Sequence, residues 1–64
     1  MDKKYFCEPV YAGNASPTGY DQEIPAASPA DAEILYRDWL AQCGYDEDLT
    51  LAHPGWEVRV ENAS

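Results

Sequence analysis

The sequence predicts an α+β fold of β-α-β-β order, in which one helix packs on one face of a small, mainly antiparallel sheet. Two segments carry this prediction. Residues 28–43 have the end signals and the apolar spacing of a helix, and apolar and polar residues alternate strictly over residues 56–61. With 64 residues, the chain is expected to form a single compact domain, 1–64, near the lower limit for a self-sufficient core.

The first strand is expected over residues 3–11, where tyrosine, phenylalanine and valine favour extended structure. Pro9 cannot donate a hydrogen bond to a neighbouring strand, so this strand is expected at a sheet edge or with a bulge. Residues 12–28 contain several glycines and prolines and are expected to form a long surface loop, with room for a short extended segment over 19–24. Asp21 and Glu23 make this loop acidic.

The helix over residues 28–43 is the most clearly signalled element. Ser28 is a favourable N-cap, Pro29 fits the first helical position, and Gly44 suits the left-handed residue that ends a helix. Glu33 and Arg37 have the spacing of an ion pair along the helix. The apolar stripe expected to face the sheet consists of Ala32, Leu35, Tyr36, Trp39, Leu40 and Cys43.

The C-terminal residues 49–62 are expected to form a β-hairpin. Leu49 and Leu51 would lie on one face of a short strand, and a His-Pro-Gly turn leads from it into the alternating segment. Trp56 begins that segment on its inward face. It is therefore expected to be buried opposite Trp39 of the helix.

The charge balance is unusual for a folded chain. Twelve acidic residues stand against four basic ones, which gives a net charge of −8. Two of the bases are Lys3 and Lys4, so residues 5–64 carry eleven acids against Arg37 and Arg59, a net −9. A small domain needs a net charge of only about 2–8 for solubility. A surface of this sign repels phosphates, so direct binding to nucleic acid is not expected.

No group suited to catalysis or metal binding stands out. The lone histidine, His53, lies in a turn, and no phosphate-binding loop, serine-hydrolase motif or zinc-ligand spacing occurs. Cys7 and Cys43 are expected to be reduced, buried thiols. The chain is therefore expected to be a non-enzyme with no cofactor and no metal. Because it has neither a signal peptide nor an apolar run that spans a membrane, a cytoplasmic location without membrane contact is expected.

Carboxylates recur in most of the expected elements, and this distribution favours a surface for a basic partner. A compact acidic fold can occupy the groove of a DNA-binding protein in place of DNA. The residues expected to contact the partner first are Asp38, Asp46, Glu47 and Asp48. The further candidates are Asp21, Glu23, Asp31, Glu33, Glu57 and Glu61.

In its size, its acidity, its expected fold and its lack of a catalytic motif, the chain resembles the small phage-encoded anti-CRISPR proteins of the acidic DNA-mimic kind. The resemblance implies an inhibitor that binds a CRISPR effector complex, in the cytoplasm of the infected bacterial host, at the surface that takes target DNA. A monomer is expected. Three alternatives remain open: an acidic surface kept for solubility, an adaptor that binds a protein through an exposed Ile34, and a redox-responsive protein in which Cys7 and Cys43 pair.

Overall fold

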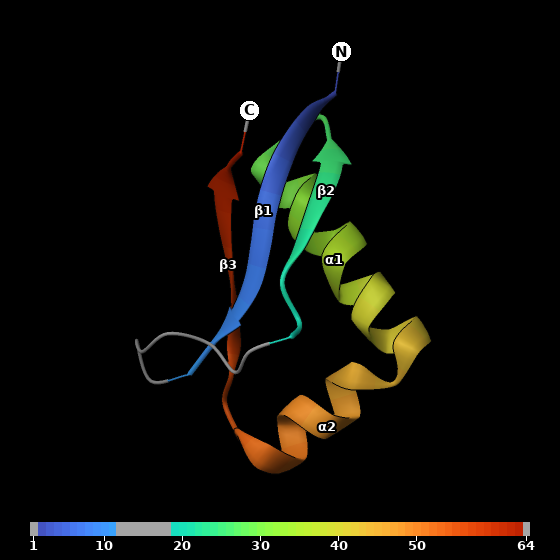
Figure 1. Cartoon of the computed structure of the whole chain (residues 1–64), viewed down its shortest axis with the longest axis vertical. Helices are drawn as coiled ribbons and strands as arrows, with labels where there is room; N and C mark the ends of the chain where they lie inside the picture. Colours follow the sequence, from blue (N-terminus) through green and yellow to red (C-terminus); the bar gives the residue numbers. More distant parts are fainter. Residues whose placement is uncertain (1, 12–18, 64) are drawn as a thin grey trace.

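Three antiparallel strands form a sheet in the order β2-β1-β3, and α1 covers one face of that sheet (Figure 1). The structure is a computed structural model that describes residues 2–11 and 19–63. Its elements, in chain order, are β1 (Lys3–Val10), β2 (Gln22–Ala26), α1 (Pro29–Cys43), α2 (Tyr45–Ala52) and β3 (Glu57–Asn62). The predicted α+β class with a small antiparallel sheet is confirmed, but the element order is ββααβ rather than βαββ.

The predicted hairpin over residues 49–62 is wrong, because its first half belongs to the helix α2. Leu49 is 1% exposed and Leu51 is 82% exposed, so the two leucines lie on opposite sides of a helix rather than on one side of a strand. Three acidic residues in the first turn favour α2, since negative charge there interacts favourably with the positive end of the helix dipole. As a result, β3 pairs with β1 and with no segment of the C-terminal half.

β1 is the central strand, although Pro9 predicted an edge strand or a bulge. β2 pairs with β1 only as far as Cys7, whereas β3 continues to Val10. The carbonyl of Lys4 accepts a hydrogen bond from Ala63 on the β3 side, so by alternation the odd-numbered residues direct their backbone groups toward β2. Pro9 therefore lies past the end of the pairing with β2. At this position, the absence of a backbone N–H removes no hydrogen bond from the described part of the sheet.

β2 lies within the segment 12–28, for which a long surface loop is predicted. The expected extended segment exists, but it covers Gln22–Ala26 instead of 19–24 and pairs with the first half of β1. Residues 12–18 of the expected loop lie outside the described residues. Ala26, at 3% exposure, joins the core, so this part of the chain is fixed to the sheet.

α1 begins and ends where the sequence predicts. The hydroxyl of Ser28 accepts a hydrogen bond from the backbone N–H of Asp31 at 3.2 Å. Gly44 ends the helix with a φ of 78°, the left-handed conformation that glycine adopts without strain. The side chains that α1 buries completely are those of Ala32, Tyr36 and Leu40.

The buried stripe of α1 is narrower than predicted. The completely buried side chains follow an i, i+4 line, and neither Leu35 nor Cys43 lies on it. Leu35 is 47% exposed, and Cys43 is exposed. Trp39 and Trp56 are predicted to be buried opposite each other across the helix–sheet interface, but both are only half-buried. Trp39 instead stacks on Tyr36, with 5.9 Å between the ring centroids.

Candidate functional site

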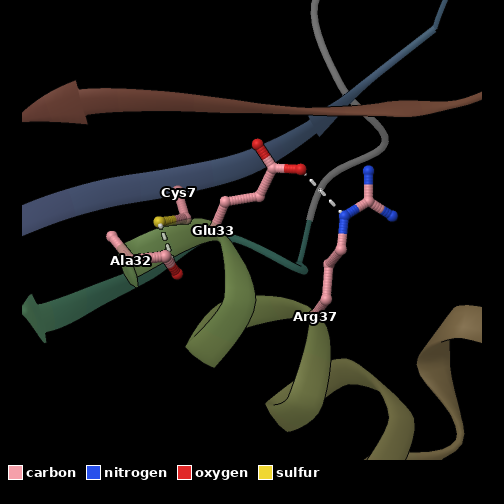
Figure 2. Close-up of polar contacts among 4 residues, drawn as sticks. All are labelled: Cys7, Ala32, Glu33 and Arg37. Atoms are coloured by element: carbon pink, nitrogen blue, oxygen red, sulfur yellow. Dashed lines mark hydrogen bonds and ion pairs between the residues drawn. The ribbon is translucent and has the colours of Figure 1, made fainter. Parts of the chain in front are cut away.

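Both arginines of the chain are held by carboxylates. Arg37 Nε lies 3.0 Å from Glu33 Oε2 along α1, which confirms the predicted i,i+4 pair (Figure 2). Arg59 Nη2 lies 2.9 Å from Glu8 Oε1, and its Nε lies 3.3 Å from Glu61 Oε1. Neither arginine is therefore left to balance the remaining acidic side chains.

The other carboxylates form no ion pair within the described part of the chain. Asp46 is half-buried and the rest are exposed. Lys3 and Lys4, also exposed, lie together at the start of β1. The unpaired carboxylates belong to Asp2, Asp21, Glu23, Asp31, Asp38, Asp46, Glu47, Asp48 and Glu57.

The densest group lies at the beginning of α2. Asp46 Oδ1 accepts a hydrogen bond from the N–H of Glu47 at 2.9 Å, and the hydroxyl of Thr50 donates to the carbonyl of Asp46 at 2.8 Å. A shallow hollow of about 380 Å³ lies beside this turn, lined by the same three residues and by Leu51. Asp48 is exposed on the same turn. The first turn of α2 thus carries three carboxylates, of which those of Glu47 and Asp48 are exposed and that of Asp46 is half-buried.

A second group lies on the sheet face that the helices leave uncovered (Figure 1). The strand register places Glu23 of β2 and Glu61 of β3 on either side of Phe6. Glu57 lies at the other end of β3 and is exposed. Arg59 belongs to this face and pairs with Glu61, so part of the negative charge of the second group is neutralised.

A third group lies on α1. Asp31 is in the first turn, and Asp38 is two turns later and accepts a hydrogen bond from Gln42 Nε2 at 2.7 Å. Glu33 projects toward the sheet beside Arg37 (Figure 2), so it does not belong to the outer surface with the two aspartates. Asp21 lies one residue before β2 and two residues before Glu23 of the second group.

The ten predicted contact residues are therefore not brought together in one cluster. No described contact joins Asp38 to the acidic turn of α2, with which it was expected to act. Within α1, Glu33 is already paired, which leaves it less free to attract a partner than its neighbours. The acids are distributed over several sides of the molecule.

Sequence reasoning missed the role of Glu8. Its side chain is 13% exposed and pairs with Arg59. The pair depends on the register of β1 and β3, in which Glu8 lies directly opposite Arg59. Only a correct pairing of these two strands can reveal this contact, so no local signal identifies it.

The cysteines differ in environment and are both free. Cys7 is fully buried, as predicted, and its Sγ donates weakly to the carbonyl of Ala32 at 3.9 Å (Figure 2). Burial, and secondarily the charge of Glu33, raises the pKa of the Cys7 thiol. Cys43 is exposed at the end of α1, contrary to the prediction. Since the thiolate is the reactive form of cysteine, the raised pKa of Cys7 makes this residue a poor nucleophile.

No cluster of histidine, cysteine and carboxylate side chains suited to a metal ion occurs among the described residues. None of the described helices combines the length and apolarity needed to cross a membrane. No protein-family model, curated protein or solved structure matches the chain. The arrangement of charge on the fold therefore supplies the basis for a functional proposal.

Proposed function

We propose that the protein is an acidic inhibitor that binds the DNA-binding surface of a bacterial defence complex, a CRISPR effector, and blocks recognition of target DNA by mimicry. The observation that carries the proposal is the set of exposed carboxylates without ion-pair partners in the described chain. Carboxylates of this kind attract the lysines and arginines that hold phosphates in a DNA-binding groove.

The charge of the protein can be compared with that of a DNA duplex of the same length. The molecule is 36 Å long, and a duplex of that length carries about 21 phosphate charges, at roughly one per 1.7 Å. The net charge of −8 is about two-fifths of that value on a body of comparable length. The lysines and arginines that pair with DNA phosphates can also pair with the carboxylates of an anionic protein, although its lower charge gives a smaller electrostatic gain.

The distribution of the cations supports inhibition over a surface kept only for solubility. Arg37 and Arg59 are paired within the fold, and Lys3 and Lys4 are confined to one end of β1. Mixed charges of both signs are enough for solubility, whereas long stretches of a single sign are suited to steering toward an oppositely charged partner. The inhibitor would act as a monomer in the cytoplasm of the infected host.

A second candidate function is an adaptor that binds a protein through an apolar helix surface. It is favoured by Ile34, which is 65% exposed on α1 and contributes nothing to the core. Salt dependence separates the two functions, because apolar contacts are insensitive to ionic strength while exposed charge pairs are screened.

Mobility shift of target DNA, with a panel of purified single-protein and multi-subunit CRISPR effectors, tests the proposal. Added at increasing concentration, the protein is expected to release the DNA from at least one effector. Its direct binding to that effector, measured without DNA, is expected to be weaker at about 300 mM salt than at about 50 mM. The control is the chain with Asp46→Asn, Glu47→Gln and Asp48→Asn, which keeps the shapes and removes three charges. Failure to displace DNA from any effector, or direct binding to the effector that is unaffected by salt, would contradict the proposal.

A further inference from the structure

The outer side of α1 carries two aliphatic side chains that the fold does not use. Ile34 is 65% exposed and Leu35 is 47% exposed, although each lies in the middle of the helix. Single exposed aliphatics are common, but two adjacent ones on a 15-residue helix form a small apolar patch. Burial against the sheet does not explain them, because that face is completed by other residues.

Acidic side chains border this patch at both ends. Asp31 lies three residues before Ile34, and Asp38 lies three residues after Leu35. With 3.6 residues per turn, residues at these spacings share one side of the helix. Asp31, Ile34, Leu35 and Asp38 are called here the outer α1 face.

The outer α1 face holds no cation. Arg37, the one arginine of the helix, lies three residues after Ile34 and so borders this face, but two contacts direct its guanidinium away from it. Its Nε pairs with Glu33 at 3.0 Å, and its guanidinium carbon lies 5.2 Å from the ring centroid of Trp56, near the start of β3. Figure 2 shows the side chains of Glu33 and Arg37 extending toward the strands. The charge that surrounds the apolar pair is therefore of one sign.

We infer that the outer α1 face binds a basic amphipathic helix of the partner protein. Asp31 and Asp38 are seven residues apart, which corresponds to about 10.5 Å along the axis at 1.5 Å per residue. A partner helix with two lysines or arginines at the same spacing, and apolar residues between them, matches both features. The inference rests on the proposed function, because it takes this helix to be part of a DNA-binding protein.

Charge complementarity selects this occupant over a second copy of the chain. Two copies joined through their outer α1 faces would bring aspartates of one against aspartates of the other, in molecules that each carry a net −8. Like charges placed opposite each other at an interface are strongly unfavourable. A partner helix of opposite charge gains from both the apolar contact and the ion pairs.

A defined peptide tests this face directly, in place of the partner protein. The probe is a helical peptide of about 15 residues with two lysines seven positions apart and two leucines between them on the same side. Amide chemical shifts of the labelled protein are recorded as the peptide is added. A second peptide, with the leucines replaced by glutamine, has the same charge and serves as the electrostatic control.

The largest shifts are expected on α1 around Ile34 and Leu35, and the glutamine peptide is expected to bind at least about tenfold more weakly. Ile34→Ser should weaken the leucine peptide by a similar factor, while Leu51→Ser should leave its affinity unchanged. Leu51 is the matched control because it is 82% exposed on α2, beside carboxylates of its own. Asp38→Lys should abolish the binding.

Shifts spread evenly over α1, α2 and β3, or an Ile34→Ser variant that binds as tightly as the wild type, would overturn the inference. Concentration-dependent shifts of the protein alone at these residues would also overturn it, because they would mean that a second copy covers the face. The outcome is separable from that of the proposed function. A protein that displaces DNA but takes the peptide elsewhere refutes only the assigned face, and the reverse result refutes only the inhibition.

Discussion

The phenol of Tyr36 donates a hydrogen bond to the backbone carbonyl of Tyr20, and this bond ties the middle of α1 to the chain just before β2. Tyr36 is completely buried, and burial is the main reason that its pKa is raised above its ordinary value of 10.0. The hydroxyl therefore stays protonated and acts as a donor over a wide pH range. The bond fixes the segment that presents Asp21 and Glu23 at the surface.

Replacement of Tyr36 by phenylalanine is expected to lower the free energy of unfolding by about 1–3 kcal/mol, because the carbonyl of Tyr20 loses its donor in a partly buried position. Urea unfolding followed by tryptophan fluorescence measures the change. Tyr45→Phe is the control, since no hydrogen bond of the Tyr45 hydroxyl is described while its ring packs against Tyr20. Equal stability of the Tyr36→Phe variant and the wild type would show that the bond contributes nothing.

Stability is expected to fall as the pH rises above about 9. The raised pKa values of Cys7 and Tyr36 mean that the unfolded chain releases these protons first, near the ordinary values of 9.0 and 10.0. Their contribution is constant at lower pH and is lost at higher pH, by at most about 1.4 kcal/mol per pH unit for each group. Urea unfolding between pH 7 and pH 10.5 measures the decline.

The double variant Cys7→Ala, Tyr36→Phe is the matched control for this pH dependence. It lacks both groups, so its free energy of unfolding should decline less steeply above pH 9 than that of the wild type. The comparison uses slopes rather than absolute stabilities, because the substitutions also remove packing and a hydrogen bond. Parallel declines for both proteins would contradict the assignment.

Because α2 is a helix, Leu49 and Leu51 are expected to contribute differently to the stability of the fold. Leu49→Ala should cost about 2–5 kcal/mol, because it empties a completely buried site. Leu51→Ala should leave the melting temperature almost unchanged, since that side chain is 82% exposed. In the strand expected from sequence, the two leucines share a face and lose similar amounts. Similar losses in thermal melts would therefore favour a strand.

The two ends of α1 should be sensitive in different ways. Ser28→Ala is expected to cost about 0.5–2 kcal/mol, through the lost bond to the N–H of Asp31. Gly44→Ala should cost about 1–2 kcal/mol, because its φ of 78° is unfavourable for a residue with a Cβ. Gly44→Asn should cost less, as asparagine tolerates this conformation. Thermal melts that rank alanine and asparagine equally at position 44 would contradict the backbone explanation.

Local signals predicted the elements whose ends and faces they define. The caps of α1 at Ser28 and Gly44 and the alternation along β3 depend on nearby residues, and both agree with the structure. α2 was missed because Leu49 and Leu51 have the spacing of a strand. The acidic first turn of α2 is a local helix signal, but the burial of Leu49 on one side of the helix is a tertiary contact that the sequence does not display.

The candidate site shows the same division. Acidic residues can be identified from sequence, but which of them remain unpaired depends on strand register. Glu8 lies opposite Arg59 only because β3 pairs with β1, and this pairing was hidden by the expected hairpin. The spacing of Leu35 predicts a place in the buried stripe, but the side chain is exposed in the packed structure. The outer α1 face follows from that difference.

Target-DNA binding by a CRISPR effector, measured with charge-neutralised forms of the protein, tests the inhibitor function most directly. The first form carries Asp38→Asn, Asp46→Asn, Glu47→Gln and Asp48→Asn, and the second carries Glu57→Gln and Glu61→Gln. The first should need at least about tenfold more protein to release the DNA, because exposed, unpaired carboxylates supply the attraction. The second should lose less, since Arg59 already neutralises Glu61. If both forms, with melting temperatures close to that of the wild type, release DNA at the wild-type concentration, then electrostatic mimicry is wrong.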